Sequence, residues 1–346
     1  MQPDSVRTET VEPVVVVGAG LMGVGIAVVF SLAGHQVTLI ENDADRRRLA
    51  MARLRQALDV EVEHDLIDVR AADTAAARVR CGDDLRAACV PSALDDSEAA
   101  GVGSVPPALV IEAIPEDLLL KKRLFAELDG WLPPSTLLCT NTSGLSIGAI
   151  AEGLRHPTRV CGMHFWNPAH LIPLVEVVRG PATSDTTTLR AQELLAAAGK
   201  TPVVVRKDVP GFVGNRLQHA LQREAMSLVA HGIADAEDID LVVTQGFGRR
   251  LGVVGPLAIC DLAGLDLVLD VDRYLLRDLE DSPEPSPLLE DLVAAGHIGV
   301  ATGKGFREWT QIATEATIAR RDAALIAALR ADRAREPDEQ DPAGAH

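Results

Sequence analysis

The stretch that decides the fold is Val14-Val15-Val16-Val17-Gly18-Ala19-Gly20-Leu21-Met22-Gly23, which continues into small apolar residues. Four consecutive β-branched residues predict a strand buried on both faces of a parallel sheet. The Gly18-x-Gly20-x-x-Gly23 pattern predicts a tight turn into a helix that packs closely on that strand. Free N–H groups and the positive end of the helix dipole suit the pyrophosphate of a dinucleotide. We therefore predict cofactor contacts from Gly18, Gly20, Leu21, Met22 and Gly23.

The segment after this helix completes a β-α-β unit. A second apolar run, Val37-Thr-Leu-Ile40, predicts a strand that ends in Glu41. An acidic residue at this tip can accept hydrogen bonds from both ribose hydroxyls of an adenosine, and it repels a 2′-phosphate. Glu41 therefore favours NAD over NADP. The alternative is a glycine-rich turn that binds nothing, but strand, turn, helix, strand and acid in this order argue against it.

Length, charge and cysteine content exclude several classes of protein. The chain has 346 residues, of which 47% are hydrophobic, enough for two globular domains. A net charge of −17 disfavours nucleic acids and anionic membranes as partners. Five cysteines without a C-x-x-C pair predict reduced thiols, with no disulfide framework and no metal site. Because we see no signal peptide and no membrane-spanning run, we expect a soluble, cytoplasmic protein.

The order of apolar runs predicts an α/β domain followed by an all-helical one. We expect a Rossmann-type doubly wound sheet in residues 13–206, a helical domain in 207–330, and disordered tails at 1–12 and 331–346. Residues 44–77 predict one long helix or a helical pair. Strands are expected at 14–17, 37–40, 79–81, 108–114, 136–140, 159–165, 174–178 and 202–205.

Three polar residues follow or end predicted strands of the first domain: Ser143, His164 and Glu176. Ligands of an open parallel sheet bind beyond the carboxyl ends of its strands, so these side chains could converge on a cofactor. Oxidation of an alcohol by NAD needs a base, and histidine titrates nearest to neutral pH. Glu176 lies in an apolar run and could fix the imidazole tautomer. From the residues alone, a buried core histidine and an outward-facing glutamate remain an equal alternative.

Several motifs, in order along the chain, resemble the L-3-hydroxyacyl-CoA dehydrogenase family in its broad sense. The resemblance covers nearly all of residues 13–310, so it is much more specific than one glycine pattern. The matching segments are Gly18-Ala-Gly-Leu-Met-Gly23, Ile111-Glu-Ala-Ile-Pro-Glu116, Asn141-Thr-Ser-Gly-Leu145, Gly162-Met-His-Phe-Trp-Asn-Pro168, Leu174-Val-Glu-Val177, Asp208-Val-Pro-Gly-Phe-Val-Gly-Asn-Arg216 and Gly303-Lys-Gly-Phe306.

The resemblance implies catalytic roles for four residues. His164 matches the general base and Glu176 the carboxylate that orients it. Ser143 and Asn215 match side chains that hydrogen-bond the substrate oxygen and the surroundings of the histidine. On the residues alone, Asn215 would be taken for a helix-surface asparagine.

The resemblance also implies the cofactor, the assembly and the reaction. The cofactor is expected to be NAD, and the chain is expected to form a homodimer through its helical domain. The reaction would interconvert a 3-hydroxyacyl-CoA, with a short chain favoured, and the 3-ketoacyl-CoA, in fatty acid metabolism. Glu41 matches the ribose ligand, and the positions that line the nicotinamide half are Glu116, Lys121, Ser143 and Asn167.

Departures from the acyl-CoA pattern lie in or near the predicted substrate and cofactor lining. They are Gly144 in place of a second serine, Trp166 in place of Phe, Ala169-His-Leu-Ile172 in place of a Val-Pro-Val-Met-like run, and Ala301 in place of lysine. These changes resemble branches that oxidise hydroxy acids or ring alcohols without CoA, such as the L-gulonate 3-dehydrogenase group. His170 could contact a carboxylate there, although a loop histidine without a role is the simpler interpretation.

Two alternatives to the acyl-CoA reaction therefore stay open. One keeps the chemistry but changes the substrate to a free hydroxy acid or sugar acid. The other is a non-catalytic dinucleotide-binding protein. The presence of Ser143, His164, Glu176 and Asn215 argues against the second, because a binding module needs none of them.

Overall fold

The computed structural model describes residues 11–90 and 105–334, which form two compact units. The first unit contains the described residues up to Val213 together with 322–334, and the second contains 214–321. This division differs from the expected boundary at 206/207. Residues 207–213 stay with the first unit because Phe212 is buried there at 1% exposure. The helix α14 (Gln311–Ala334) begins in the second unit and ends in the first.

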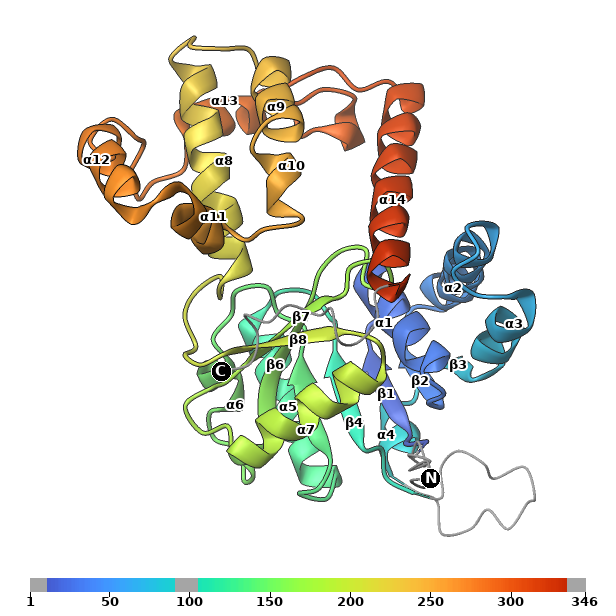
Figure 1. The fold of residues 1–346 in the computed structure, drawn as a ribbon. Coiled ribbons are helices and arrows are strands. Elements are labelled where there is room, and N and C mark those ends of the chain that lie inside the picture. Colours follow the sequence, from blue (N-terminus) through green and yellow to red (C-terminus); the bar gives the residue numbers. More distant parts are fainter. Residues whose placement is uncertain (1–10, 91–104, 335–346) are drawn as a thin grey trace, which may run out of the picture. The chain divides into compact units, whose positions relative to one another are not determined.

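The first unit is built on an eight-stranded sheet with the order β3-β2-β1-β4-β5-β6-β7-β8 (Figure 1). Every neighbouring pair is parallel except β6 and β7, which run antiparallel. The strand order reverses between β1 and β4, which creates the switch point where open α/β sheets bind ligands. The predicted Rossmann-type sheet is thus confirmed. Its strands are β1 (Val14–Val17), β2 (Val37–Ile40), β3 (Val79–Gly82), β4 (Leu109–Glu112), β5 (Leu137–Thr140), β6 (Val160–Phe165), β7 (Leu174–Val178) and β8 (Thr201–Val205).

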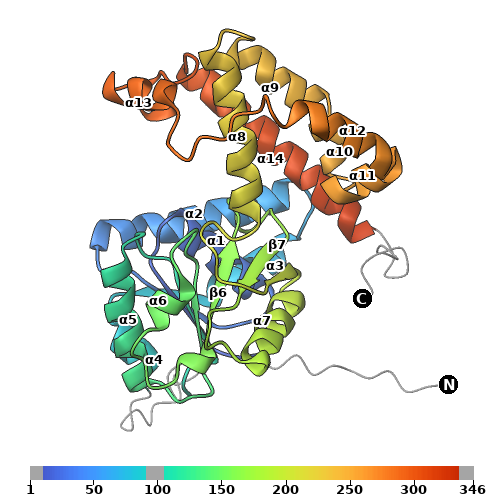
Figure 2. The same ribbon diagram turned by 90° about the vertical axis from the view of Figure 1, so that its left-hand side faces the viewer.

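Helices cover both faces of this sheet and enclose two apolar cores. One core packs α1, α2, α3 and α7 against the sheet, and the other packs α4, α5 and α6 on the opposite face (Figure 2). The expected helix or helical pair at 44–77 is a pair, in which Asp43 and Asp68 cap the two N-termini. The helices are α1 (Leu21–Leu32), α2 (Ala44–Glu63), α3 (Val69–Ala77), α4 (Leu85–Cys89), α5 (Leu118–Trp131), α6 (Ile147–Ala151) and α7 (Asp185–Ala197).

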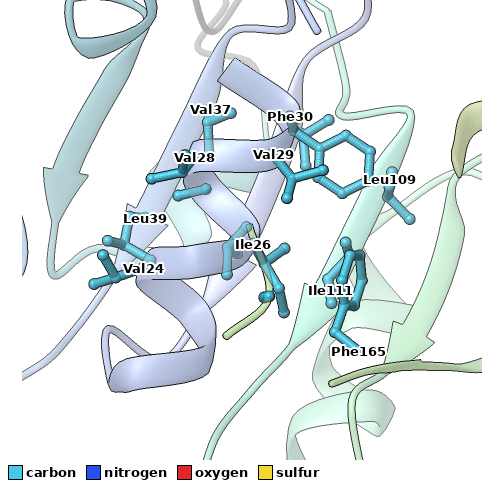
Figure 3. Close-up of a cluster of buried hydrophobic side chains, with 14 of the residues drawn as sticks. Val24, Ile26, Val28, Val29, Phe30, Val37, Leu39, Leu109, Ile111 and Phe165 are labelled. Carbon is cyan, nitrogen blue, oxygen red and sulfur yellow. The ribbon is translucent and has the colours of Figure 1, made fainter. Parts of the chain in front are cut away.

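The helix α1 lies at the centre of the first core. Its side chains Ile26, Val28 and Phe30 are fully buried and pack among Val37, Leu39, Leu109, Ile111 and Phe165 of the neighbouring strands (Figure 3). Fully burying one such side chain contributes about 1.5–3 kcal/mol. The glycine turn is therefore held in place by the buried strand β1 before it and by the buried helix α1 after it.

The second unit is helical, as expected, but it has little core of its own. None of the side chains in α8–α13 is buried within the chain. Two isolated β-bridges connect Gly299 to Lys304 and Lys304 to Glu308. The helices are α8 (Gly214–Ala230), α9 (Ala236–Gln245), α10 (Gly248–Leu251), α11 (Pro256–Ala263), α12 (Leu265–Leu275) and α13 (Pro287–Ala294).

The predicted tails fall mostly outside the described residues. Residues 331–334 are a correction, because they continue α14 in place of the expected disorder. The helix persists because Ile326 and Leu329 are buried and Arg333 donates to the Leu66 carbonyl at 2.9 Å. Glu12 is likewise ordered, and Arg190 donates to its carboxylate at 2.8 Å. Within the described ranges, no helix has the length and apolarity needed to cross a membrane.

Candidate active site

The glycine turn between β1 and α1 has the geometry that a pyrophosphate site needs. Gly18 has a φ of +103°, and a Cβ there would lie 2.6 Å from the Ala113 carbonyl oxygen. A Cβ at Gly23 would lie 1.8 Å from the Gly18 carbonyl oxygen. Both positions therefore exclude any side chain. A Cβ at Gly20 would meet nothing within 4 Å, so the space above the start of α1 is open.

The surroundings of this open space fit a dinucleotide. The helix α1 has no side-chain cap and no acidic residue in its first turn, which leaves its N–H groups available to an anion. Glu41 follows β2, and its carboxylate accepts from the Ala19 N–H at 3.3 Å and from the Asp43 N–H at 3.1 Å. The acid is thus held beside the glycine turn, where the ribose of NAD would lie. Leu21, at the start of α1, is 64% exposed on the same turn.

The Gly20→Ala variant tests this site, and we expect it to weaken NADH binding about 10-fold, or ~1.4 kcal/mol. Gly20 has a φ of −69° and a ψ of −171°, which alanine adopts easily, so the free energy of unfolding should not fall. The added methyl would project into the pyrophosphate space. Fluorescence titration with NADH measures the effect. Gly130→Ala, in α5, is the matched control, since its Cβ also meets nothing within 4 Å; equal NADH affinity in both variants would contradict the placement.

His164 and Glu176 form a buried pair at the carboxyl end of β6. The antiparallel register places them directly opposite each other on β6 and β7. His164 Nδ1 lies 2.8 Å from Glu176 Oε2, and the two residues are 4% and 2% exposed. Because an ionised carboxylate can only accept, Nδ1 is the donor in this contact, and in the neutral imidazole Nε2 then keeps its lone pair. This is the arrangement of a general base.

The turn at 209–213 completes the enclosure of this pair. Glu176 Oε1 accepts from the Val213 N–H at 3.0 Å, so both carboxylate oxygens are engaged. Phe212 has a φ of +51°, which is rare for an aromatic residue, and its ring packs edge-on against His164 at 5.6 Å between centroids. Trp166 packs on the imidazole at 5.4 Å. The left-handed turn at Phe212 thus brings the next N–H to Glu176 and shields the pair from water.

A second buried ion pair connects β4 with α5. Lys121 Nζ lies 2.6 Å from Glu112 Oε1, and both side chains are almost completely buried. Thr140 donates to Glu112 Oε2 at 2.7 Å, and the Ile114 N–H donates to Oε1 at 2.8 Å. Burial raises the pKa of Glu112, while Lys121 opposes that shift. Glu112 therefore connects the end of β4 to α5 through Lys121 and to the end of β5 through Thr140, beside the switch point.

Glu116 extends this network toward Ser143. Lys121 Nζ also lies 3.2 Å from Glu116 Oε2, and the Thr142 hydroxyl and the Ser143 N–H both donate to Glu116 Oε1. Partial burial acts to raise the pKa of Glu116, but the bond from Thr142 and the charge of Lys121 outweigh it and lower the pKa. The loop after β5 is also connected to β6, because Asn141 Oδ1 accepts from the Phe165 N–H at 2.9 Å. Ser143 is thereby held at the same sheet edge as the imidazole.

Comparison with known proteins decides the family. A family model for the 3-hydroxyacyl-CoA dehydrogenase NAD-binding domain matches residues 13–209, and the model for its C-terminal domain matches residues 211–309. The chain belongs to the 3-hydroxyacyl-CoA dehydrogenase family. It is an NAD-dependent dehydrogenase, as the glycine turn and Glu41 predicted.

Relatives in this family cover almost the whole chain. The 5-formyl-3-hydroxy-2-methylpyridine 4-carboxylate 5-dehydrogenase of Mesorhizobium japonicum is 34% identical and covers 93% of this chain and 99% of its own. A probable 3-hydroxybutyryl-CoA dehydrogenase of Bacillus subtilis is 36% identical, with 87% and 98% covered. A solved 5-dehydrogenase of the same pyridine carboxylate, described as an NAD+ dependent dismutase, has a TM-score of 0.83 at 32% identity and covers 94% of this chain and 100% of its own. For the Escherichia coli 3-hydroxybutyryl-CoA dehydrogenase structure the TM-score is 0.68 at 34% identity, with 86% and 60% covered.

The predicted site residues of this dehydrogenase fall into two groups. Those of the first unit, including Ser143 and the exposed Asn167, lie at or next to the carboxyl edge of the sheet. Lys121 differs from the others because its ammonium is not open to a ligand: it is 1% exposed and paired with the carboxylates of Glu112 and Glu116. Asn215 is in α8 of the second unit, so its predicted contact with the site of the first unit stays a prediction.

Sequence reasoning missed Glu112 and Phe212 as parts of the site. The signal for Glu112 was available, since a carboxylate inside the apolar strand Leu109–Glu112 is the same pattern that singled out Glu176. No signal marked Phe212, because its role depends on a positive φ that the sequence does not predict for an aromatic residue.

Proposed function

We propose that this dehydrogenase interconverts short-chain 3-hydroxyacyl-CoA and 3-ketoacyl-CoA, with His164 as general base. The observation that carries the proposal is the buried contact between His164 Nδ1 and Glu176 Oε2 at 2.8 Å, at the strand edge where the cofactor binds. The relatives named 3-hydroxybutyryl-CoA dehydrogenase support the substrate class.

The proposed proton movement follows from the tautomer. Bound NAD would supply the hydride acceptor in the oxidative direction, and bound NADH the hydride donor in the reverse. His164 Nε2 takes the hydroxyl proton as the carbon is oxidised, and Glu176 stabilises the imidazolium that forms. The aromatic rings of Phe212 and Trp166 exclude water from the pair, which strengthens the electrostatic interaction between imidazolium and carboxylate.

The remaining predicted residues have positioning and binding roles in this proposal. Ser143 and Asn215 would hydrogen-bond the substrate oxygen. Glu116 and Asn167 would line the nicotinamide half of the cofactor, and Lys121 would do so through Glu116, which it contacts. Glu41 would hold the adenosine ribose.

A free carboxylic acid is the second candidate substrate, and a specific observation favours it. The pyridine-carboxylate relative aligns over 324 residues, whereas the Bacillus relative aligns over 302. Its solved counterpart also has the higher TM-score of the two structures compared above. The departures at Gly144, Trp166 and His170 fit a substrate without CoA.

A matched pair of ketones distinguishes the two candidates. Oxidation of NADH would be followed optically with acetoacetyl-CoA and with acetoacetate, which carry the same acyl group with and without CoA. For an acyl-CoA enzyme we expect kcat/KM to be about 100-fold or more higher with the thioester, because binding of the remote nucleotide lowers the barrier at the keto group. A preference for acetoacetate, or for a ring or sugar keto acid assayed in the same way, would select the second candidate. Turnover with none of these would contradict both.

We also propose that the protein forms a homodimer through its helical unit. Large apolar side chains there are exposed within one chain, among them Leu257 and Leu262 at 80% each and Val253 at 79%. So many large apolar side chains exposed in one helical unit support an interface there. Sedimentation should report twice the chain mass of 36.7 kDa, and a monomer at micromolar concentration would contradict this assembly.

A cytoplasmic location and a place in fatty acid metabolism complete the proposal. All five cysteines are free, including the buried pair Cys139 and Cys161, which fits a reducing compartment. The metabolic assignment depends on the acyl-CoA substrate and would change with it.

A further inference from the structure

The loop that joins the two catalytic strands is held by a single buried ammonium group. His164 is near the end of β6 and Glu176 is near the start of β7, and residues 166–173 connect them. Lys200, just before β8, donates to three carbonyl oxygens of this loop: Ala169 at 2.6 Å, Ile172 at 3.0 Å and His170 at 3.4 Å. An ammonium has three donors, so these bonds use its full capacity.

The other side of the loop is confined by α1. A Cβ placed on Gly25 would lie 3.0 Å from the Ala169 Cβ, so the loop packs directly on the helix whose N-terminus faces the cofactor. Ala169 is 2% exposed. The loop is therefore held both by its close contact with α1 and by the Lys200 ammonium, and it has little room to shift while both contacts persist.

The Lys200 ammonium is buried, and its charge is compensated mainly by the loop carbonyls. Lys200 is 9% exposed, and burial lowers its pKa to about 8, with the charge of Glu61 opposing the shift and Arg333 adding to it. Glu61, at the end of α2, is 1% exposed, and its Oε1 has no hydrogen-bond partner. The Glu61 carboxylate thus attracts Lys200 by its charge, but its Oε1 accepts no hydrogen bond from the ammonium. The loop carbonyls are the groups that compensate the buried ammonium.

We propose that Lys200 is a positioning residue for the reaction, which fixes the β6–β7 loop and through it the orientation of His164 on Glu176. The inference rests on the proposed role of His164 as the base. Lys200 itself does not contact substrate or cofactor, because all three of its N–H groups are used inside the protein. Losing the three bonds would free the loop and allow the imidazole to move relative to the cofactor.

The Lys200→Met variant tests this role, because methionine has a similar length but no donor. The primary readout is the ring nitrogen signals of 15N-labelled histidine in the NADH-bound protein, with the His164 signals assigned by their loss in His164→Asn. We expect these signals to shift in Lys200→Met and to stay unchanged in the control Lys207→Met, which removes an exposed ammonium. This readout does not require turnover, so it remains valid if the proposed substrate is wrong.

Kinetics with whichever ketone proves to be the substrate provides the second readout. We expect kcat to fall about 100-fold, as for a reacting geometry displaced by about 1 Å, with smaller changes in KM and in the NADH Kd, to which Asn167 of the same loop would contribute. Lys200→Arg should restore most of kcat because guanidinium can also donate to several carbonyls. If Lys200→Met does not fold, Lys200→Gln takes its place, because its shorter side chain has only two donors and cannot form all three bonds. Unchanged His164 signals in a folded variant that lacks the three bonds would overturn the proposal.

Discussion

Replacing His164 with alanine is expected to lower kcat by about 10²–10⁴-fold, the contribution of a positioned general base. The imidazole is the group that Glu176 orients at 2.8 Å, and alanine leaves no acceptor for the hydroxyl proton. NADH affinity should stay within about twofold, because the glycine turn lies between β1 and α1, Glu41 follows β2, and neither depends on the imidazole. Steady-state kinetics and fluorescence titration measure the two effects separately.

A second histidine provides the control for this substitution. His231 follows α8, is exposed and hydrogen-bonds to Ser227, so His231→Ala should keep the wild-type kcat. If His164→Ala retained turnover near the wild-type rate, His164 would not be the base. If His164→Ala lost NADH binding together with turnover, the loss of turnover would come from a disrupted fold and not from removal of the base.

The Lys121→Met variant is expected to lower the free energy of unfolding by about 3–5 kcal/mol, the cost of removing one partner of a buried ion pair. Lys121 and Glu112 are 1% and 0% exposed, and methionine would leave the Glu112 carboxylate buried without its cation. Denaturant unfolding at neutral pH measures the loss. The NADH-free protein should be used, so that cofactor binding does not mask it.

Two further measurements separate charge from packing in this variant. Glu112→Gln combined with Lys121→Met removes both charges, and we expect it to recover most of the lost stability, since Thr140 can turn to accept from the amide. In Lys121→Met, loss of the cation raises the folded-state pKa of Glu112 further above its unfolded value. The variant should therefore be least affected below the unfolded pKa and lose stability as the pH rises through the folded one. A double variant no more stable than Lys121→Met would contradict the ion-pair account.

Most of the sheet could be predicted from the sequence because its strands are short apolar runs bounded by turn residues. The run Val14–Val17 forms the buried strand, and the glycines after it allow α1 to pack closely on that strand. Both properties depend on residues that are neighbours in the sequence. The predicted and observed strand bounds differ by a few residues where an apolar run extends beyond the hydrogen-bonded strand. Residues 108–114 were predicted as a strand, and only Leu109–Glu112 form one.

The catalytic pair could be predicted as residues but not as a contact. Seen along the chain, His164 and Glu176 are separated by twelve residues, and only the antiparallel reversal between β6 and β7 places them opposite each other. The residue pattern left open whether His164 and Glu176 are catalytic or structural, and the resemblance to the dehydrogenase family favoured the catalytic roles. Other features depend on long-range packing, which has no local signal. In the site, Lys200 reaches a loop about thirty residues earlier, and in the fold α14 returns to the first unit at Asp322.

The central claim is that Glu176 sets the tautomer of His164 so that Nε2 can move the substrate proton. The most direct test is a single turnover of protein-bound NADH with the accepted ketone, in the wild type and in Glu176→Gln, whose amide can donate to Nδ1 and place the proton on Nε2. The account predicts equal NADH binding and a rate about 10²-fold or more lower in Glu176→Gln. Equal single-turnover rates in the two proteins would contradict it.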